Sequence, residues 1–155
     1  MKRWFRGFLT AVGIATAAAG CAEELPPPEP ATSSQFEPGQ VWRYKTRPGE
    51  EGSRVIVGKI EHAPKLGTIV HVKLTGLRLK NPSAPAGISE VMSHAPVSEP
   101  QLSASVTELT DGDGDLEGFS DGYATWLSSY RSGEAGVFTI SLAEIAEYME
   151  RALSQ

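Results

Sequence analysis

The sequence predicts an α+β domain, in which a small antiparallel sheet of about four strands is covered on one face by about three helices. Two observations support this fold class. After residue 40, apolar residues alternate with polar ones, as in strands that have one buried face. From residue 98 onward they recur mainly at the three- and four-residue spacing of amphipathic helices, which gives the order β-β-β-α-α-β-α.

The first 20 residues have the composition of a secretory signal peptide. Lys2, Arg3 and Arg6 supply positive charge, and residues 8–19 are uncharged and mostly apolar. This apolar stretch is shorter than the roughly 20 residues that a bilayer-spanning helix needs. We therefore expect residues 1–20 to be removed during export.

Small residues stand directly before the only cysteine of the chain. The segment Ala18-Ala19-Gly20-Cys21 resembles the lipobox of bacterial lipoproteins, although that family usually has Leu where this chain has Ala18. The resemblance implies that the peptidase recognises the three small residues and that Cys21 becomes acylated. The alternative is an ordinary secretory cut that leaves Cys21 incidental. Lipidation is favoured because it consumes a thiol that has no partner for a disulfide.

The resemblance also implies a location in the bacterial cell envelope, with the membrane as the first partner. Ala22 follows the cysteine where Asp would favour the inner membrane, so we expect the outer membrane, facing the periplasm. Residues 21–35 then form the lipidated Cys and a proline-rich tether that needs no fold of its own. Without residues 1–20 the chain has 11 basic and 19 acidic residues, which gives no drive toward nucleic acid.

Residues 36–155 are predicted to form a single domain that begins with three strands. They span residues 41–45, 54–61 and 70–80, the last with a β-bulge at Gly76 that keeps its apolar residues on one face. His71 falls on the polar face of this strand, where we expect it to be solvated. Residues 81–96 contain three prolines and are expected to form a long irregular connection.

Three helices and one short strand are expected in the second half. A capping box at Ser98 predicts a helix that continues through Val106 and Leu109, and a second helix spans residues 116–130. Residues 137–140 form a short fourth strand. Ser141 followed by Glu144 is another capping box, which predicts the last helix, up to Leu153.

Charge is divided between the two halves of this domain. Residues 41–80 hold nine Lys and Arg and three acidic residues, whereas residues 81–155 hold two Arg and 12 acidic residues. One interpretation is that the basic sheet and the acidic remainder attract each other within the domain. The other is a basic surface that binds an anionic partner.

Few residues suggest chemistry. The acidic run at residues 111–117 lacks the Gly and Glu that an EF-hand loop requires at its sixth and twelfth positions, so no metal site is predicted. His94 is expected to hydrogen-bond the backbone of its own loop. No nucleophile–base pair or phosphate-binding loop is recognisable. We therefore predict neither a cofactor nor an enzymatic activity.

The most distinctive segment is residues 42–51, in which aromatic and cationic side chains alternate. Such a segment either forms a recognition surface or a half-buried strand. The possible binding surface consists of Trp42, Arg43, Tyr44, Arg47 and His94. Together with the Ser93-His94 loop and residues 132–153, the W-x-Y-K-T-R-P-G-E-E opening resembles a family of small uncharacterised bacterial proteins. This resemblance covers residues 36–153 and implies a compact α+β domain without an established activity.

Two functions remain open at the level of the sequence. The first is a lipid-anchored interaction protein that binds another envelope protein or a toxin, in the manner of an inhibitor or immunity protein. The second is a small-ligand-binding or hydrolytic domain that uses His94 and the loop at residues 81–97.

Overall fold

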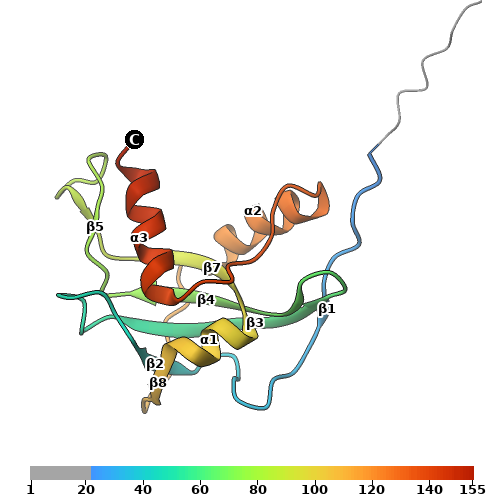
Figure 1. Cartoon of the computed structure of the whole chain (residues 1–155), viewed down its shortest axis with the longest axis horizontal. Helices are drawn as coiled ribbons and strands as arrows, with labels where there is room; N and C mark the ends of the chain where they lie inside the picture. Colours follow the sequence, from blue (N-terminus) through green and yellow to red (C-terminus); the bar gives the residue numbers. More distant parts are fainter. Residues whose placement is uncertain (1–21) are drawn as a thin grey trace, which may run out of the picture.

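The computed structural model describes residues 22–155, and the predicted site residues Ala18, Ala19, Gly20 and Cys21 lie outside the described residues. The α+β class is confirmed (Figure 1). The elements are β1 (Glu29–Pro30), β2 (Val41–Tyr44), β3 (Arg54–Ala63), β4 (Gly67–Thr75), β5 (Leu79–Lys80), β6 (Ile88–Ser89), β7 (Met92–Ser98), α1 (Glu99–Ser105), β8 (Val106–Leu109), α2 (Phe119–Arg131) and α3 (Leu142–Leu153). No helix among these residues is long and apolar enough to cross a membrane.

The main sheet is antiparallel and larger than the four strands expected. Its strand order is β7-β4-β3-β2-β8, and β1 pairs with the C-terminal end of β3, so that the sheet has six strands. β5 and β6 form a separate two-stranded hairpin. The expected strand at residues 137–140 is reduced to a single parallel bridge between Phe138 and Val97 of β7.

The predicted third strand is interrupted at Gly76. β4 ends at Thr75, and Gly76 has a φ of 68°, a conformation that favours glycine. A Cβ at this position would also lie 3.1 Å from the carbonyl oxygen of Gly52. Gly76 therefore turns the chain out of the sheet toward β5, and the predicted bulge is wrong. The bulge in β3 lies instead at Gly58, where the register with β4 shifts between Val57 and Lys59.

Two more predictions are wrong for one reason, which is pairing with distant strands. The connection predicted to be irregular at residues 81–96 is so only at residues 81–87 and 90–91, because the rest forms β6 and most of β7, and β7 pairs along β4. The helix predicted from Ser98 ends at Ser105, because Val106–Leu109 pairs with β2 as strand β8. Ser98 makes no side-chain cap, whereas Ser141 and Glu144 form the predicted capping box of α3.

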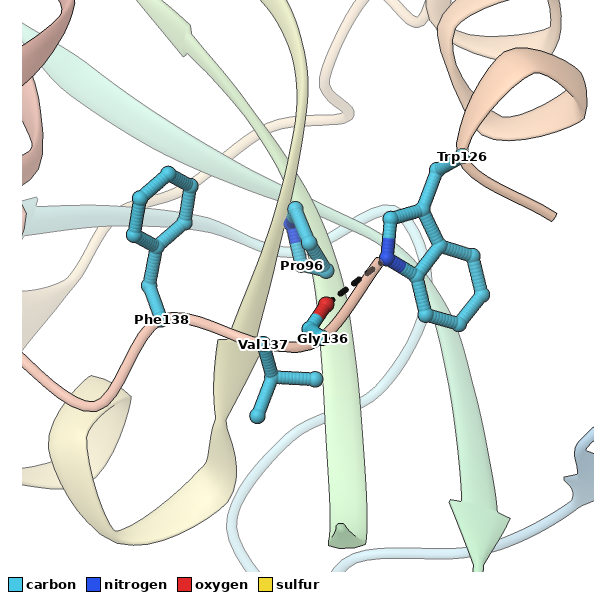
Figure 2. A pocket seen from close by; sticks show the side chains of 5 residues that line it. All are labelled: Pro96, Trp126, Gly136, Val137 and Phe138. Atoms are coloured by element: carbon cyan, nitrogen blue, oxygen red, sulfur yellow. Dashed lines mark hydrogen bonds between the residues drawn. The ribbon is translucent and has the colours of Figure 1, made fainter. Parts of the chain in front are cut away.

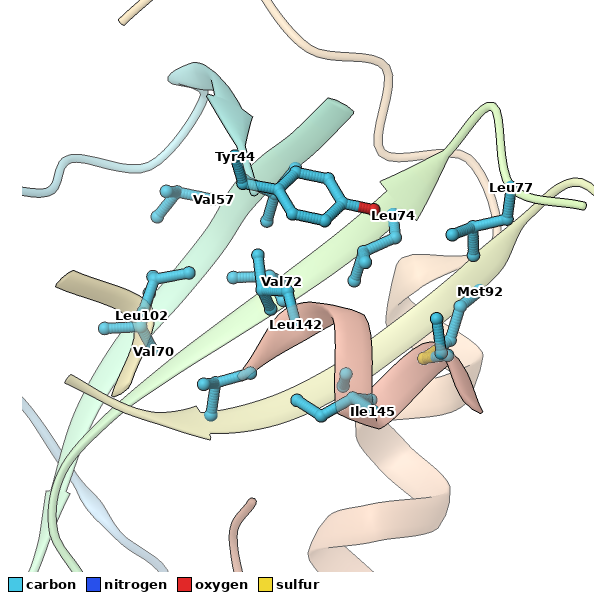
Figure 3. Close-up of a cluster of buried hydrophobic side chains, with 14 of the residues drawn as sticks. Tyr44, Val57, Val70, Val72, Leu74, Leu77, Met92, Leu102, Leu142 and Ile145 are labelled. Atoms are coloured by element: carbon cyan, nitrogen blue, oxygen red, sulfur yellow. The ribbon is translucent and has the colours of Figure 1, made fainter. Parts of the chain in front are cut away.

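The larger core lies between the sheet and helices α1 and α3 (Figure 3). Val70 and Val72 of β4 pack there with Leu102 of α1 and with Leu142 and Ile145 of α3. All five side chains are fully buried. Burial of each aliphatic side chain contributes about 1.5–3 kcal/mol.

The other face of the sheet is covered by α2, so the helices do not all lie on one face, as was expected. Ile69 and His71, which alternate with the core residues of β4, contact Trp126 of α2. β4 is therefore buried on both faces, although its sequence alternates like that of a half-exposed strand.

The N-terminal strap, residues 24–31, is held against the domain. Leu25 packs against the buried cluster that includes Ile69 and Tyr130, and it donates its backbone N–H to the carbonyl of Arg131 at 2.7 Å. The Glu24 carboxylate pairs with the Arg131 guanidinium at 2.6 Å. Farther along, β1 adds to β3. The prediction that residues 22–35 need no fold of their own is wrong for this segment.

The charge division leads to pairing within the domain, as the first interpretation predicted. Lys73 of β4 is buried and lies 3.8 Å from Asp115 of the acidic loop. On the other side of the molecule, Arg47 lies 3.4 Å from Glu150 of α3. The acidic second half thus neutralises part of the basic sheet.

Candidate functional site

Three ionisable side chains from neighbouring strands meet on the face of the sheet that α2 covers. Glu61 of β3, His71 of β4 and His94 of β7 form a continuous chain of hydrogen bonds. The Nε2 atom of His71 lies 3.1 Å from Oε2 of Glu61, and its Nδ1 atom lies 2.9 Å from Nε2 of His94. Glu61 and His71 are almost inaccessible to solvent, with exposed fractions of 2% and 0%.

Lys59 and Tyr123 close the carboxylate end of this chain. The Tyr123 hydroxyl donates to Oε1 of Glu61 at 2.8 Å, and the Lys59 ammonium group lies 3.0 Å from the same oxygen. Lys59 also donates to the Tyr123 hydroxyl at 3.2 Å and lies 4.4 Å from the centre of its ring. The buried carboxylate is therefore fully hydrogen-bonded, as a buried charge must be.

The partners determine where the histidine protons lie. Because Glu61 accepts at Oε2, neutral His71 carries its proton on Nε2 and accepts at Nδ1. His94 must then donate from Nε2, which leaves its Nδ1 atom as an acceptor. That Nδ1 atom has no protein partner and is not among the buried unsatisfied atoms of residues 22–155, so solvent reaches it.

Both histidines are neutral in the folded protein at neutral pH. Burial, together with the positive charge of Lys59, lowers the pKa of His71 to about 3. Burial and the neighbouring His71 lower the pKa of His94 to about 4. Burial and the hydrogen bond to Glu61 raise the pKa of Tyr123. The electrostatics thus oppose any further proton on the chain of histidines.

Aromatic rings of α2 surround the two histidines. The Trp126 ring lies 4.7 Å from that of His71, and the Phe119 ring lies 5.5 Å from that of His94. Gly122 allows this close approach, because a Cβ there would lie only 2.6 Å from Cβ of His94. These ring contacts, together with the hydrogen bond from Tyr123 to Glu61, hold α2 against the sheet at this position.

Trp126 also lines a pocket of about 300 Å³ (Figure 2). The Trp126 indole donates to the carbonyl of Gly136 at 2.8 Å and forms one wall. The pocket is lined by Pro96, Trp126, Gly136, Val137 and Phe138. His94 does not line it.

The residues of the predicted binding surface do not form one surface. Tyr44 is buried in the core and shares a hydrogen bond of 2.6 Å with Ser53. Arg47 is engaged by Glu50, its guanidinium lying 2.6 Å from that carboxylate, which raises the pKa of Arg47. Trp42 is half-buried against Phe36.

Arg43 is the most accessible of these residues. Its side chain is 55% exposed and lies 3.6 Å from Glu108 of the edge strand β8. Trp42, which pairs with Leu109 of the same strand, lies beside it. Of the five predicted residues, Trp42 and Arg43 therefore remain together near one edge of the sheet, whereas His94 lies on the face that α2 covers.

The predicted environments of two histidines are wrong. His71 is buried rather than solvated, and His94 binds His71 rather than the backbone of a loop. Glu61, Lys59 and Tyr123 were not recognised as members of a site. The available signal was that Glu61, His71 and His94 are all polar residues on or beside apolar strands.

The acidic loop before α2 has a structural role. Asp115 accepts a hydrogen bond from the backbone of Glu117 at 2.9 Å, and the carbonyl of Glu117 accepts one from Lys73 at 2.8 Å. Over residues 22–155, no three His, Cys, Asp or Glu side chains are placed to hold a metal ion. His71, for example, uses its two nitrogens for two different partners.

No protein-family model, curated protein or solved structure matches this chain. The resemblance of residues 36–153 to a family of small bacterial proteins therefore stays a prediction.

Proposed function

We propose that this chain is a lipid-anchored protein of the bacterial cell envelope, with the outer membrane as its location. One observation carries the proposal: the only cysteine follows Ala18-Ala19-Gly20 at the end of an uncharged apolar stretch that begins with basic residues. Two or three acyl chains on Cys21 would suffice for a durable anchor, since each buried methylene contributes about 0.8 kcal/mol.

The anchor is tested by labelling cells with radioactive palmitate. The wild-type chain should incorporate the label, and Cys21→Ser should not. The conservative Ala18→Leu variant, which restores the usual lipobox residue, should be labelled at least as strongly as the wild type. Equal labelling of the wild type and Cys21→Ser would refute the proposal.

The domain on this anchor is proposed to act as an interaction module for another envelope protein or a toxin. The support is the edge of strand β8, which pairs only with β2 among the described strands and carries Leu109 with 48% exposure. Such an edge can accept an extended segment of a partner. Arg43 and Glu108 beside it supply exposed charges of both signs.

This role predicts where a partner can be captured. A photo-crosslinking residue in place of Glu108 should trap a partner in the envelope, and high salt should weaken the capture. The same residue in place of Glu147 on α3, which is also exposed to solvent, is the matched control. Equal products from both positions would contradict an interaction at the β8 edge.

A small-ligand or hydrolytic site at His94 is the second candidate, because its Nδ1 atom is an accessible acceptor on a carboxylate–histidine chain. General bases act best when their pKa is near the working pH, and the pKa of His94 is about 4. The electrostatics thus favour binding of a hydrogen-bond donor over hydrolysis. Equal hydrolysis of p-nitrophenyl acetate by the wild type and His94→Gln would end the hydrolytic version.

A further inference from the structure

We propose that this domain lies directly on the bilayer surface, with the end that holds the N-terminal strap facing the membrane. This end comprises the strap, the turn between β3 and β4 and the C-terminal end of α2. The inference rests on the lipid anchor proposed at Cys21, and it adds an orientation that an anchor alone does not give.

The chain between the anchor and the domain is short. The carboxylate of Glu24 pairs with Arg131, and the backbone N–H of Leu25 donates to the carbonyl of the same residue. Only three residue steps separate Glu24 from Cys21, and an extended chain covers about 10 Å in three steps. A free tether of 15 residues, from Cys21 to Phe36, would have an average span of about 20 Å.

The strap is attached to the domain along its length. Pro28 is buried, β1 pairs with β3, and the backbone N–H of Ala31 donates to the carbonyl of Ile60 at 3.1 Å. Phe36 then enters the core with 1% exposure. These contacts are spread over more than ten residues and hold the strap along the domain.

The strap lies at one end of the molecule. A groove of about 430 Å³ lies between the strap and the rest of the domain there, and it is lined by Glu23, Leu25, Pro26, Pro64, Lys65, Leu66, Tyr130, Ser132, Gly133 and Ala135. The β5–β6 hairpin lies at the opposite end of the long axis (Figure 1). The two ends therefore differ in their predicted distance from the bilayer.

The chemistry of the strap end suits the headgroup layer. Each headgroup layer of a bilayer is about 5–7 Å thick, so a reach of about 10 Å places the Glu24–Arg131 pair at its outer boundary. The charges at this end nearly balance, with Lys65 and Arg131 against Glu23, Glu24 and Glu134. Contact should therefore need no anionic lipid, because the anchor rather than net charge brings the surfaces together.

The test uses the lipidated protein in phosphatidylcholine vesicles that contain headgroup-nitroxide lipid. Because the thioether consumes Cys21, an introduced cysteine is the only thiol that a fluorophore can label. Lys65→Cys at the strap end and Ser83→Cys in the distal hairpin are both exposed positions. The label at position 65 should lose most of its emission to the nitroxide, and the label at position 83 should lose little.

A longer connection provides the control for orientation. Inserting about 12 Gly and Ser residues between Ala22 and Glu23 leaves every strap contact in place but adds an average span of about 19 Å. Quenching at position 65 should then fall toward that at position 83. Equal quenching at the two positions in the protein without the insertion would overturn the orientation alone, whereas failure of palmitate labelling would overturn the anchor and the orientation together.

Discussion

Mild acid should destabilise this domain through its two buried histidines. In the folded chain the pKa of His71 is about 3 and that of His94 about 4, each lowered from 6.5 chiefly by burial. Between pH 6.5 and pH 4 the unfolded chain therefore binds protons at these histidines that the folded chain does not bind. Protons then favour the unfolded state, and stability falls as the pH falls.

The magnitude follows from the size of these shifts. Lowering the pH from 7.5 to 5.5 should cost about 1.4 kcal/mol for each histidine and about 2.8 kcal/mol for the pair. Lys59 lies at the carboxylate end of the cluster, and its positive charge adds to burial in opposing a proton on His71. Carboxyl groups whose pKa is lowered in the folded chain, such as those of Glu50 and Glu150, also stabilise the fold. Their contribution is lost mainly below pH 4.5, which lies outside this window.

The assay is urea unfolding of the Cys21→Ser chain, followed by tryptophan fluorescence at the two pH values. His94→Gln keeps an amide donor for His71 and should reduce the pH-dependent loss to about 1.4 kcal/mol. His62→Gln is the matched control, because the side chain of His62 is exposed, and it should leave the loss unchanged. A wild-type loss below about 1 kcal/mol, or one that His94→Gln does not reduce, would refute the reasoning.

Two further predictions concern how the helices are held. Gly122→Ala would raise stability by about 1 kcal/mol from helix propensity alone, but its Cβ would lie 2.6 Å from Cβ of His94. We therefore expect Gly122→Ala to lower the free energy of unfolding by about 1 kcal/mol in urea unfolding. Ala124→Gly, on the exposed side of α2, is the control that measures helix propensity without the contact. A gain in stability from Gly122→Ala would show that α2 does not pack there. Ser141→Ala should cost about 1 kcal/mol because it removes the cap of α3, and Ser98→Ala, which loses no cap, less than about 0.5 kcal/mol. Equal losses from the two serines would contradict this assignment of caps.

The site was only partly accessible to sequence reasoning. His94 was selected as a candidate, but its partner His71 lies 23 residues away, and Glu61 lies ten residues before His71. No short motif joins them, since antiparallel pairing of three strands brings them together. The predicted surface at residues 42–47 is divided because side chains alternate along a strand. Tyr44 therefore enters the core, while Arg43 points to solvent.

The sequence by itself determined the elements that depend on neighbouring residues. The capping box at Ser141 forms within one helical turn, and the spacing of Trp126 and Tyr130 marks the buried side of α2 wherever that helix docks. Strand β2 follows from its alternating residues, and strand β3 from its run of Val and Ile. These features need only contacts between residues a few positions apart.

Tertiary structure decided what depends on a distant partner. Val106–Leu109 is a strand because β2 offers an open edge, and the N-terminal strap is ordered because β3 and α2 offer hydrogen bonds. His71 is buried because α2, some 50 residues later, covers its face of the sheet. Backbone and side-chain groups in such segments can satisfy their hydrogen bonds in more than one way, and only the assembled sheet selects among them.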